Sequence, residues 1–537
     1  MAPDHDGPHP WLPLTRAQQG LWFADELAGG SAAYTTAEVV EVPAPGLDHA
    51  RLAHAQARAH REHEQLRTRF AATPDGPRQQ VLDLDDATLA ARLEHVTVAD
   101  RATADAWLVA TLARPLRIAE GEVVRSALLH LADGSTWWFH AAHHVVLDGY
   151  GYLQLARRVA DLYRDPTAAP PRAATVADLV AEDTARTVDA AWWDDRLAGW
   201  DGTSSPVGSP VDSPAAATPA PAPHRAEVEL DPAAGDDLAA VARAFRVGID
   251  AVVLAAAGTY LARLLEPAGP EGPEGSAGHV RLGVPLMNRT GPSGRALTAT
   301  TVCTAMNVVP LAVPATGRPS DVVRAVAAEL AAVRDGAHVR AEDLERRLRR
   351  RAPDARLFGP TVNVLPFASE LDLGPRGTPL VGRVRNLAAG PVEDLTWGVR
   401  GAIGRGPVRV EVAAHPERYD AGATALHAHR LATWLGTFAR AAVTVTANRA
   451  DGEHDVTDLP LLHAAERHLV VATFNATDHP VRSTTLPAAF AAQVARTPGA
   501  PAVLRHAGDP ADPGAWEAWT YADLDDAAGR VAAGLRA

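Results

Sequence analysis

The segment TWWFHAAHHVVLDGYGYLQLARRVADLYR, residues 136–164, is the part of the sequence most diagnostic of the fold. Thr136 to Ala142 is mostly apolar and predicts a strand, whereas Tyr150 to Arg164 has the apolar spacing of an amphipathic helix. Between them, His143-His144-Val145-Val146-Leu147-Asp148-Gly149 places two imidazoles, a carboxylate and a glycine in one turn. Because an imidazole exchanges protons near neutral pH, this strand-to-helix turn predicts a site of proton chemistry.

Length and composition bound the class of protein. The chain has 537 residues, of which 47% are hydrophobic, so we expect several folding units and a large core. Its formal net charge of -14 argues against a nucleic-acid-binding protein, since phosphate recognition needs a basic surface. Every basic residue is arginine, and the absence of lysine excludes a Schiff-base or P-loop mechanism for the chain as given.

The compartment is predicted from the cysteine content and the apolar runs. Cys303 is the only cysteine, so no internal disulfide can form. The first ten residues lack the basic and apolar stretches of a signal peptide. The most apolar run, Ala251 to Leu265, is interrupted by Gly258 and Arg263 and falls short of the roughly 18 residues of a membrane helix. We therefore expect a cytoplasmic protein without a membrane span.

Helical and extended patterns alternate along the chain, which predicts an α/β fold. Further helices are expected at Arg16 to Leu27 behind the cap Thr15, Asp48 to Gln65, Ala234 to Phe245, Ile249 to Leu265, Leu486 to Val494 and Asp523 to Arg536. Extended segments are expected at Leu66 to Leu82, Val280 to Pro285, Met306 to Val313 and Trp516 to Tyr521. Gly202 to Ala222 is rich in Ser, Pro, Ala and Gly, and predicts a flexible connection between two lobes.

Five motifs, in order, resemble those of condensation domains of nonribosomal peptide synthetases. They are Pro13 to Phe23, Arg61 to Phe70, the signature His143 to Gly149, Gly283 to Arg289 and Met306 to Leu311. Five ordered matches are more specific than one. Near the end of the chain, Phe474 to Thr477 and Trp519 to Leu524 are similar to the entry into an adenylation domain.

The resemblance implies an α/β fold of two chloramphenicol-acetyltransferase-like lobes in a V, with a tunnel at their junction. It divides the chain into residues 1–201 for the N-terminal lobe, 202–224 for the linker, 225–450 for the C-terminal lobe, 451–474 for a second linker and 475–537 for the truncated start of an adenylation domain. The nucleotide-binding loop and the catalytic lysine of an adenylation domain are absent from the sequence, so we expect no adenylate formation by this chain.

Two short segments carry a narrower likeness. Residues 357–364 and 390–395 resemble condensation domains of siderophore synthetases of the enterobactin synthetase component F type. This likeness implies an aryl acid donor, such as a 2,3-dihydroxybenzoyl or salicyl group, but pocket side chains decide such a choice.

The reaction implied is attack of the amine of an acceptor aminoacyl thioester on the carbonyl of a donor acyl thioester, which forms an amide. His144 is then the group that takes the proton or holds the amine, and the family leaves these two roles open. The resemblance implies an ion pair between Asp148 and Arg289, while Asp148 is also suited to cap the following helix; the two roles are compatible.

Three further residues have both a functional and a structural interpretation. His143 is expected to support the turn rather than react. Gly149 either lets backbone N–H groups approach the substrate carbonyl or is simply a turn residue with positive φ. Asn363 either donates to the developing oxyanion in the substrate channel or is a satisfied structural amide.

The expected partners are a donor and an acceptor carrier protein, which supply phosphopantetheine; we expect no covalently bound cofactor, and a monomer. A zinc site is disfavoured because His140 and His143 are expected to point to opposite faces of an extended strand.

The runner-up function is a coenzyme A-dependent O- or N-acyltransferase of the same superfamily. An epimerase shares the histidine motif, but an adenylation-like segment directly after it fits condensation better.

Overall fold

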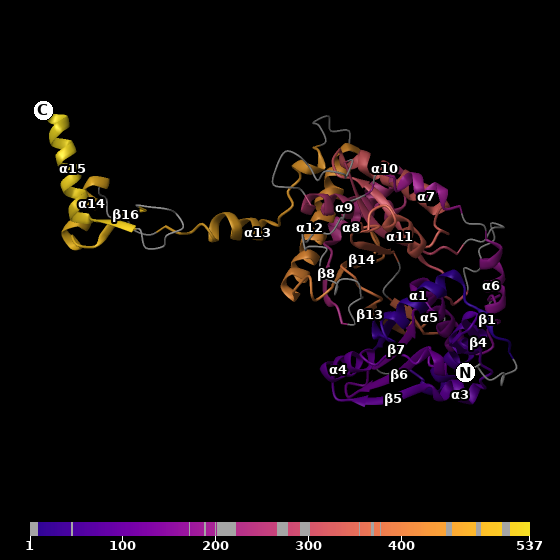
Figure 1. Cartoon of the computed structure of the whole chain (residues 1–537). Helices are drawn as coiled ribbons and strands as arrows, with labels where there is room; N and C mark the ends of the chain where they lie inside the picture. The colour runs from indigo at the N-terminus through magenta and orange to yellow at the C-terminus, as the bar shows by residue number, and fades with distance from the viewer. Residues whose placement is uncertain are drawn as a thin grey trace. The chain divides into compact units, whose positions relative to one another are not determined.

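The computed structural model describes residues 9–43, 47–170, 172–186, 189–198, 200, 222–265, 278–289, 301–353, 355–366, 370–375, 377–446, 454–478, 485–506 and 516–537. These residues divide into two compact units, residues 1–463 and 464–537, which are described separately (Figure 1). Residues 202–221 of the predicted linker lie outside the described residues, and His224 at its end opens a strand.

The first lobe contains a six-stranded sheet of order β12-β13-β2-β7-β6-β5. Its strands are β2 (Thr35–Val42), β5 (Leu93–Val98), β6 (Val124–Leu131), β7 (Thr136–His143), β12 (Glu370–Asp372) and β13 (Val381–Ala389). Every residue of β7 is buried, because alternate side chains enter two different cores. Trp138 packs with helices α2 (His49–Glu62) and α5 (Gly149–Arg164) on one face, whereas Trp137 packs with α4 (Arg101–Leu112) on the other. The strand and helix predicted around the signature turn are therefore both present.

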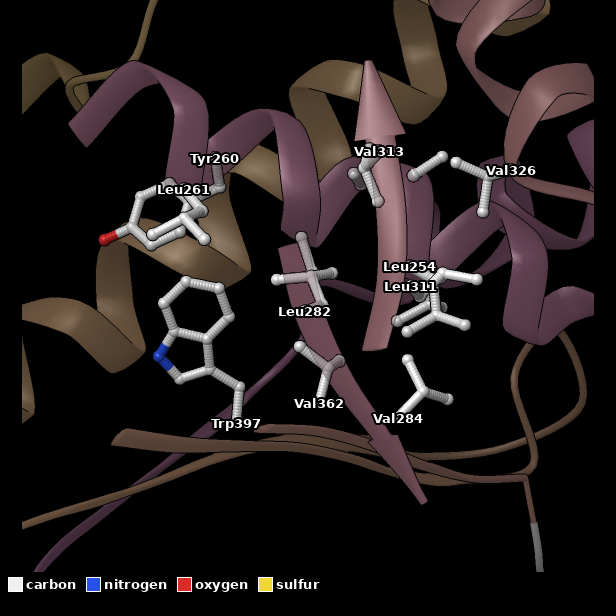
Figure 2. Packing of buried hydrophobic residues seen from close by; sticks show 14 of the residues in the cluster. Leu254, Tyr260, Leu261, Leu282, Val284, Leu311, Val313, Val326, Val362 and Trp397 are labelled. Carbon is white, nitrogen blue, oxygen red and sulfur yellow. The ribbon is translucent and has the colours of Figure 1, made fainter. Parts of the chain in front are cut away.

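The second lobe contains another six-stranded sheet, of order β10-β9-β11-β14-β15-β8. Its strands are β8 (His224–Glu229), β9 (His279–Leu286), β10 (Asn307–Pro314), β11 (Thr361–Leu365), β14 (Leu395–Gly401) and β15 (Val408–Ala414). Helices α8 (Pro232–Phe245), α9 (Ile249–Leu265), α10 (Pro319–Asp335) and α12 (Ala421–Thr446) pack with this sheet in one core. Figure 2 shows Tyr260 of α9 above Trp397 of β14, with ring centroids 5.3 Å apart. Apolar on nearly all sides, α9 is the buried centre of this lobe.

Strands β12 and β13 leave the second lobe and complete the sheet of the first. β13 pairs antiparallel with β2, from Arg383 opposite Glu41 to Ala389 opposite Thr36. From the sequence, residues 370–389 are expected in the C-terminal lobe, and the exchange of these strands is not predicted. A strand pattern specifies that a segment is extended, but the partner edge depends on pairing with residues far away in the chain.

The remaining elements of this unit complete the two lobes. β1 (Leu12–Pro13), β3 (Thr68–Thr73) and β4 (Gly76–Val81) form a small sheet, and the other helices are α1 (Arg16–Leu27), α3 (Asp86–Ala91), α6 (Val176–Ala185), α7 (Ala191–Arg196) and α11 (Ala341–Arg349). The bounds of α1 agree with the prediction because Thr15 forms a capping box with Gln18. α2 ends at Glu62, three residues earlier than predicted, because the chain turns extended at His63 before a short 3-10 segment, Glu64–Arg67.

The second unit has little buried surface. It contains α13 (Ala464–His468), a π-helical turn (Leu469–Thr473), α14 (Leu486–Arg496), the antiparallel pair β16 (Pro501–His506) and β17 (Trp516–Thr520), and α15 (Tyr521–Arg536). No described residue of this unit is buried. Large apolar side chains such as Phe474 and Trp516 are more than half exposed.

No helix within the described residues has both the length and the apolar character needed to cross a bilayer.

Candidate active site

The signature turn is held by backbone hydrogen bonds between the end of β7 and the start of α5. The amide of His143 donates to the carbonyl of Val123 at 2.9 Å, and the amide of His144 donates to the carbonyl of Tyr34 at 2.7 Å. The amide of Val146 closes the turn on the carbonyl of His143 at 3.0 Å. The backbone that carries both imidazoles is therefore fixed from two sides.

His144 has a nearly buried, uncharged imidazole. The residue is 8% exposed, and among the described residues its Nδ1 atom has no hydrogen-bond partner. Burial lowers the pKa of His144 below its ordinary value, and this effect outweighs the opposite influence of Asp148. At neutral pH the imidazole is thus neutral and can accept a proton. Its ring edge lies beside Gly390, where an added Cβ would be 3.6 Å from Nε2.

Asp148 has both of its predicted roles, as the cap of a helix and as the partner of Arg289 in an ion pair. One oxygen, Oδ1, accepts from the amide of Gly151 at 2.8 Å, as the N-cap of α5, and from Arg289 at 2.5 Å. Oδ2 accepts from the amides of Ala305 at 2.9 Å and Met306 at 3.1 Å. Burial alone would raise the pKa of Asp148, but Arg289 and the backbone donors lower it below the ordinary range. The carboxylate is thus ionised and fully bonded.

Arg289 ties the segment before β10 to the turn. Its guanidinium also donates to the carbonyls of Thr301 and Cys303, both at 2.8 Å, and lies 4.8 Å above the ring of Tyr150. Cys303 receives a further bond on Sγ at 3.3 Å, and burial raises the pKa of this thiol to about 11. The thiol is therefore protonated, and Cys303 acts here as a packing and acceptor group.

His143 and His140 turn in different directions. His143 Nε2 lies 3.5 Å from Asp25, and its Nδ1 accepts from the amide of Val145 at 3.2 Å. His140 enters the core instead, with Nδ1 2.8 Å from the hydroxyl of Tyr152, and burial lowers its pKa to about 3. Within the described part of the chain, no three side chains of His, Cys, Asp or Glu are grouped so as to hold a metal ion.

Gly149 differs from one of its two predicted roles. Its φ is not positive, because it is the first residue of α5, so the interpretation as a positive-φ turn residue is wrong. A Cβ at Gly149 would meet no atom of the described residues within 4 Å. The first turn of α5 therefore begins next to open space. A substrate carbonyl needs such space to approach a backbone N–H group at this position.

Asn363 lies on β11 of the second lobe, half-buried and opposite Gly398 of β14. Among the described residues no hydrogen bond ends on its side chain, and both interpretations of Asn363 remain predictions. The hydrogen bonds that hold the signature turn do not include it.

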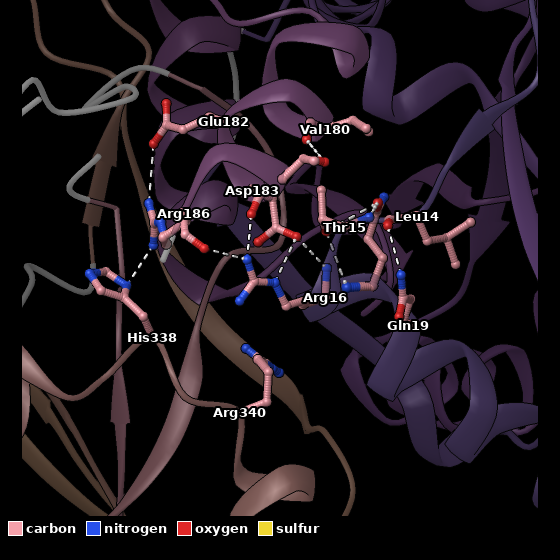
Figure 3. Close-up of polar contacts among 12 residues, drawn as sticks. Leu14, Thr15, Arg16, Gln19, Val180, Glu182, Asp183, Arg186, His338 and Arg340 are labelled. Carbon is pink, nitrogen blue, oxygen red and sulfur yellow. Dashed lines mark hydrogen bonds and ion pairs between the residues drawn. The ribbon is translucent and has the colours of Figure 1, made fainter. Parts of the chain in front are cut away.

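A polar cluster fixes the lobe junction near the site (Figure 3). Arg16 at the start of α1 contacts Asp183 of α6, with its amide 2.9 Å from the carboxylate. Arg186, just after α6, donates to Nδ1 of His338 at 2.6 Å, across to the second lobe. Two residues further, Arg340 donates to the carbonyl of Met306 at 2.7 Å, and its charge also lowers the pKa of His144. Sequence reasoning missed this cluster because its members are far apart in the chain.

Comparison with known proteins identifies the family. Residues 10–371 match the family model described as the condensation domain. The chain is 34% identical over 436 residues to the isonitrile lipopeptide synthase of Streptomyces coeruleorubidus. The aligned region covers 77% of this chain and 27% of that protein. It is also 28% identical over 510 residues to enterobactin synthase component F of Escherichia coli strain K12. That alignment covers 92% of this chain and 36% of that protein. The chain thus spans only a part of these longer relatives.

A solved structure shows the fold. The first condensation domain of the calcium-dependent antibiotic synthetase, in complex with a substrate analogue, superposes with a TM-score of 0.70 at 25% identity. The match covers 84% of this chain and 99% of that one. The predicted two-lobed, chloramphenicol-acetyltransferase-like fold is confirmed. Because the family model matches more than half of this chain, the chain belongs to the condensation domains of nonribosomal peptide synthetases, which are acyltransferases that form amide bonds.

Proposed function

We propose that this chain joins the acyl group of a donor thioester to the amine of an acceptor aminoacyl thioester, with both substrates attached to carrier proteins. The observation that carries the proposal is the position of His144, which is buried in the signature turn with Nε2 beside Gly390; burial also lowers its pKa, which favours the neutral imidazole. Phosphopantetheine arms of the carriers would bring both thioesters to this imidazole. No cofactor of the chain itself is needed for such a transfer.

The reaction forms one N–C bond and breaks two bonds, the C–S bond of the donor thioester and one N–H bond of the amine, whose proton ends on the departing thiolate. The amine nitrogen attacks the thioester carbonyl, the new N–C bond forms, the C–S bond breaks, and the donor thiolate leaves. The nitrogen must lose a proton, which His144 is placed to take because its imidazole is neutral. Holding the amine in line with the carbonyl is the second contribution, and an oriented pair of reactants gains a large entropic advantage.

The residues around His144 have supporting roles in this proposal. Asp148 and Arg289 hold the turn through their ion pair. His143 supports the turn, with its own Nε2 atom 3.5 Å from Asp25. Gly149 leaves the first amide of α5 open to the substrate carbonyl. Asn363 is proposed as a lining residue of the substrate channel.

The donor is proposed to be an aryl acid, such as a 2,3-dihydroxybenzoyl or salicyl group, in siderophore biosynthesis. Support comes from the match to enterobactin synthase component F, which covers 92% of the chain. The two segments that resemble that type, residues 357–364 and 390–395, include the glycine beside His144.

Residues 475–537 are proposed to be the first part of an adenylation domain, and the domain limits given by the sequence remain proposals. The exposed side chains of Trp516 and Trp519 support this interpretation, because apolar side chains of this size usually pack against further polypeptide. We propose no adenylating activity for this chain.

The test uses separate donor and acceptor carrier proteins, loaded chemically and mixed with the full chain. Donors are 2,3-dihydroxybenzoyl, salicyl, benzoyl and octanoyl groups, and amide formation on the acceptor carrier is followed by intact-protein mass spectrometry. We expect amide with the wild type and a large loss with His144→Ala. His95→Ala, at an exposed histidine of β5, is the matched control and keeps the wild-type rate. Equal rates for His144→Ala and the wild type, or faster transfer from free acyl-coenzyme A than from the carrier, would contradict the proposal.

A further inference from the structure

The segment that crosses from β13 to β14 passes directly over His144. Gly390 is the first residue after β13, and it is buried with a φ of +78°. A Cβ built at this position would lie 3.3 Å from Cδ2 and 3.6 Å from Nε2 of His144. The first of these distances is already tighter than ordinary contact, so a side chain here would cover one edge of the imidazole.

This edge is the one that the proposed reaction needs. Nδ1 of His144 is buried and has no hydrogen-bond partner among the described residues. Proton exchange with a bound substrate must therefore use Nε2, on the side of Gly390.

The crossing segment is held at both ends. Before Gly390, β13 pairs with β2, whose Thr36 hydroxyl in turn donates to the carbonyl of Ala142 at 3.2 Å. After it, Asp394 accepts from the hydroxyl of Tyr419 at 3.2 Å and from Arg418 at 3.4 Å, both in the second lobe. A larger residue at position 390 would therefore press on the imidazole rather than displace the backbone.

We propose that Gly390 is a positioning residue: because it has no side chain, the Nε2 edge of His144 stays open to acceptor amines that carry a large side chain. This inference rests on the proposed role of His144. It adds a specificity position that lies 246 residues further along the chain than the histidine it serves.

Two substitutions separate steric cover from backbone strain. Gly390→Ala adds one methyl group, but it also places an alanine at positive φ. Gly390→Asn adds more bulk, although asparagine adopts positive φ more readily than alanine. The strain control is Gly278→Ala, because Gly278 has a φ of +72° and a Cβ there would meet no atom of the described residues within 4 Å.

The experiment measures kcat/KM with leucyl-loaded and glycyl-loaded acceptor carriers. We expect both Gly390 variants to lose activity with the leucyl acceptor, by about 100-fold as for other small displacements at a reacting centre, and to lose much less with the glycyl acceptor. Gly278→Ala should keep the wild-type kcat/KM. Recovery of activity in Gly390→Asn relative to Gly390→Ala, or an equal loss with both acceptors, would show strain alone and overturn the inference.

A second readout does not depend on amide formation. The rate at which diethyl pyrocarbonate modifies His144, measured by peptide mass spectrometry, should fall in Gly390→Asn and stay unchanged in Gly278→Ala. An unchanged rate in Gly390→Asn would overturn the inference even if the wild type is active. If the wild type forms no amide but diethyl pyrocarbonate still modifies His144 more slowly in Gly390→Asn, the result counts against the proposed function alone.

Discussion

Removal of Arg289 should destabilise the protein by leaving a buried carboxylate without its counter-ion. Asp148 is 1% exposed and Arg289 is 9% exposed, so solvent cannot replace the lost partner. Breaking a buried pair from one side costs about 3 to 5 kcal/mol. In Arg289→Ala the carboxylate keeps the amides of Gly151, Ala305 and Met306, so we expect the lower end, about 3 kcal/mol.

Asp148→Ala should cost more than Arg289→Ala. It breaks the same ion pair, removes the N-cap of α5, worth about 1 kcal/mol, and leaves the amides of Ala305 and Met306 without acceptors. An unsatisfied amide costs about 1 kcal/mol or more, so we expect at least about 5 kcal/mol in total. Because both single variants lose the same pair, the double variant should cost about 2 to 3 kcal/mol less than the sum of the two.

Urea unfolding at pH 7, followed by tryptophan fluorescence and circular dichroism, measures these differences. A folded-state pKa below the unfolded value means that Asp148 stabilises the fold above about pH 4 and that this contribution is lost as the pH falls through the lowered pKa. The difference in free energy of unfolding between the wild type and Arg289→Ala should therefore become smaller at acidic pH. Additive effects in the double variant, or a free energy of unfolding for Arg289→Ala within about 0.5 kcal/mol of the wild type, would show that the ion pair does not stabilise the fold in this way.

Three further outcomes follow from the buried titratable groups. Because burial lowers the pKa of His144 and the neutral form accepts the proton, kcat/KM should fall in acid with a midpoint below 6.5; a midpoint at or above 6.5 would contradict this role. Burial lowers the pKa of His63 to about 4, so the unfolded chain takes up its proton first; the free energy of unfolding should therefore fall between pH 7 and pH 4 by about 3 kcal/mol more in the wild type than in His63→Gln, and an equal fall in both would count against this burial. Burial raises the pKa of Cys303 to about 11, so a disulfide reagent should react with this thiol far more slowly in the native protein than in urea, and equal rates would count against its burial.

Local signals in the sequence predict the elements around the site. α1 begins behind Thr15 and α9 spans Ile249–Leu265, as expected, because caps and apolar periodicity act within a few residues. The strand and helix on either side of the signature turn follow from the same kind of pattern. The ion pair of Asp148 with Arg289, by contrast, came from the family resemblance, since no local rule pairs residues 141 positions apart.

Contacts between distant segments could not be predicted in this way. β13 fills the edge of the first sheet beside β2, although more than 300 residues separate them in the chain. That exchange brings Gly390 over His144, and the only local signal was a glycine followed by a proline, which indicates a turn and not what the turn approaches. The role of Gly149 was ambiguous for a related reason, because a glycine can serve backbone conformation or open space and the sequence does not distinguish them.

In the proposed reaction, the imidazole of His144 meets a group carried on a pantetheine arm. A carrier protein bearing a bromoacetyl-pantetheine arm tests this directly, with the modified residue located by peptide mass spectrometry. We expect alkylation at His144, at a rate that falls when the carrier is replaced by the free bromoacetyl-pantetheine. Alkylation confined to exposed histidines such as His95, with His144 unmodified in an active preparation, would contradict it.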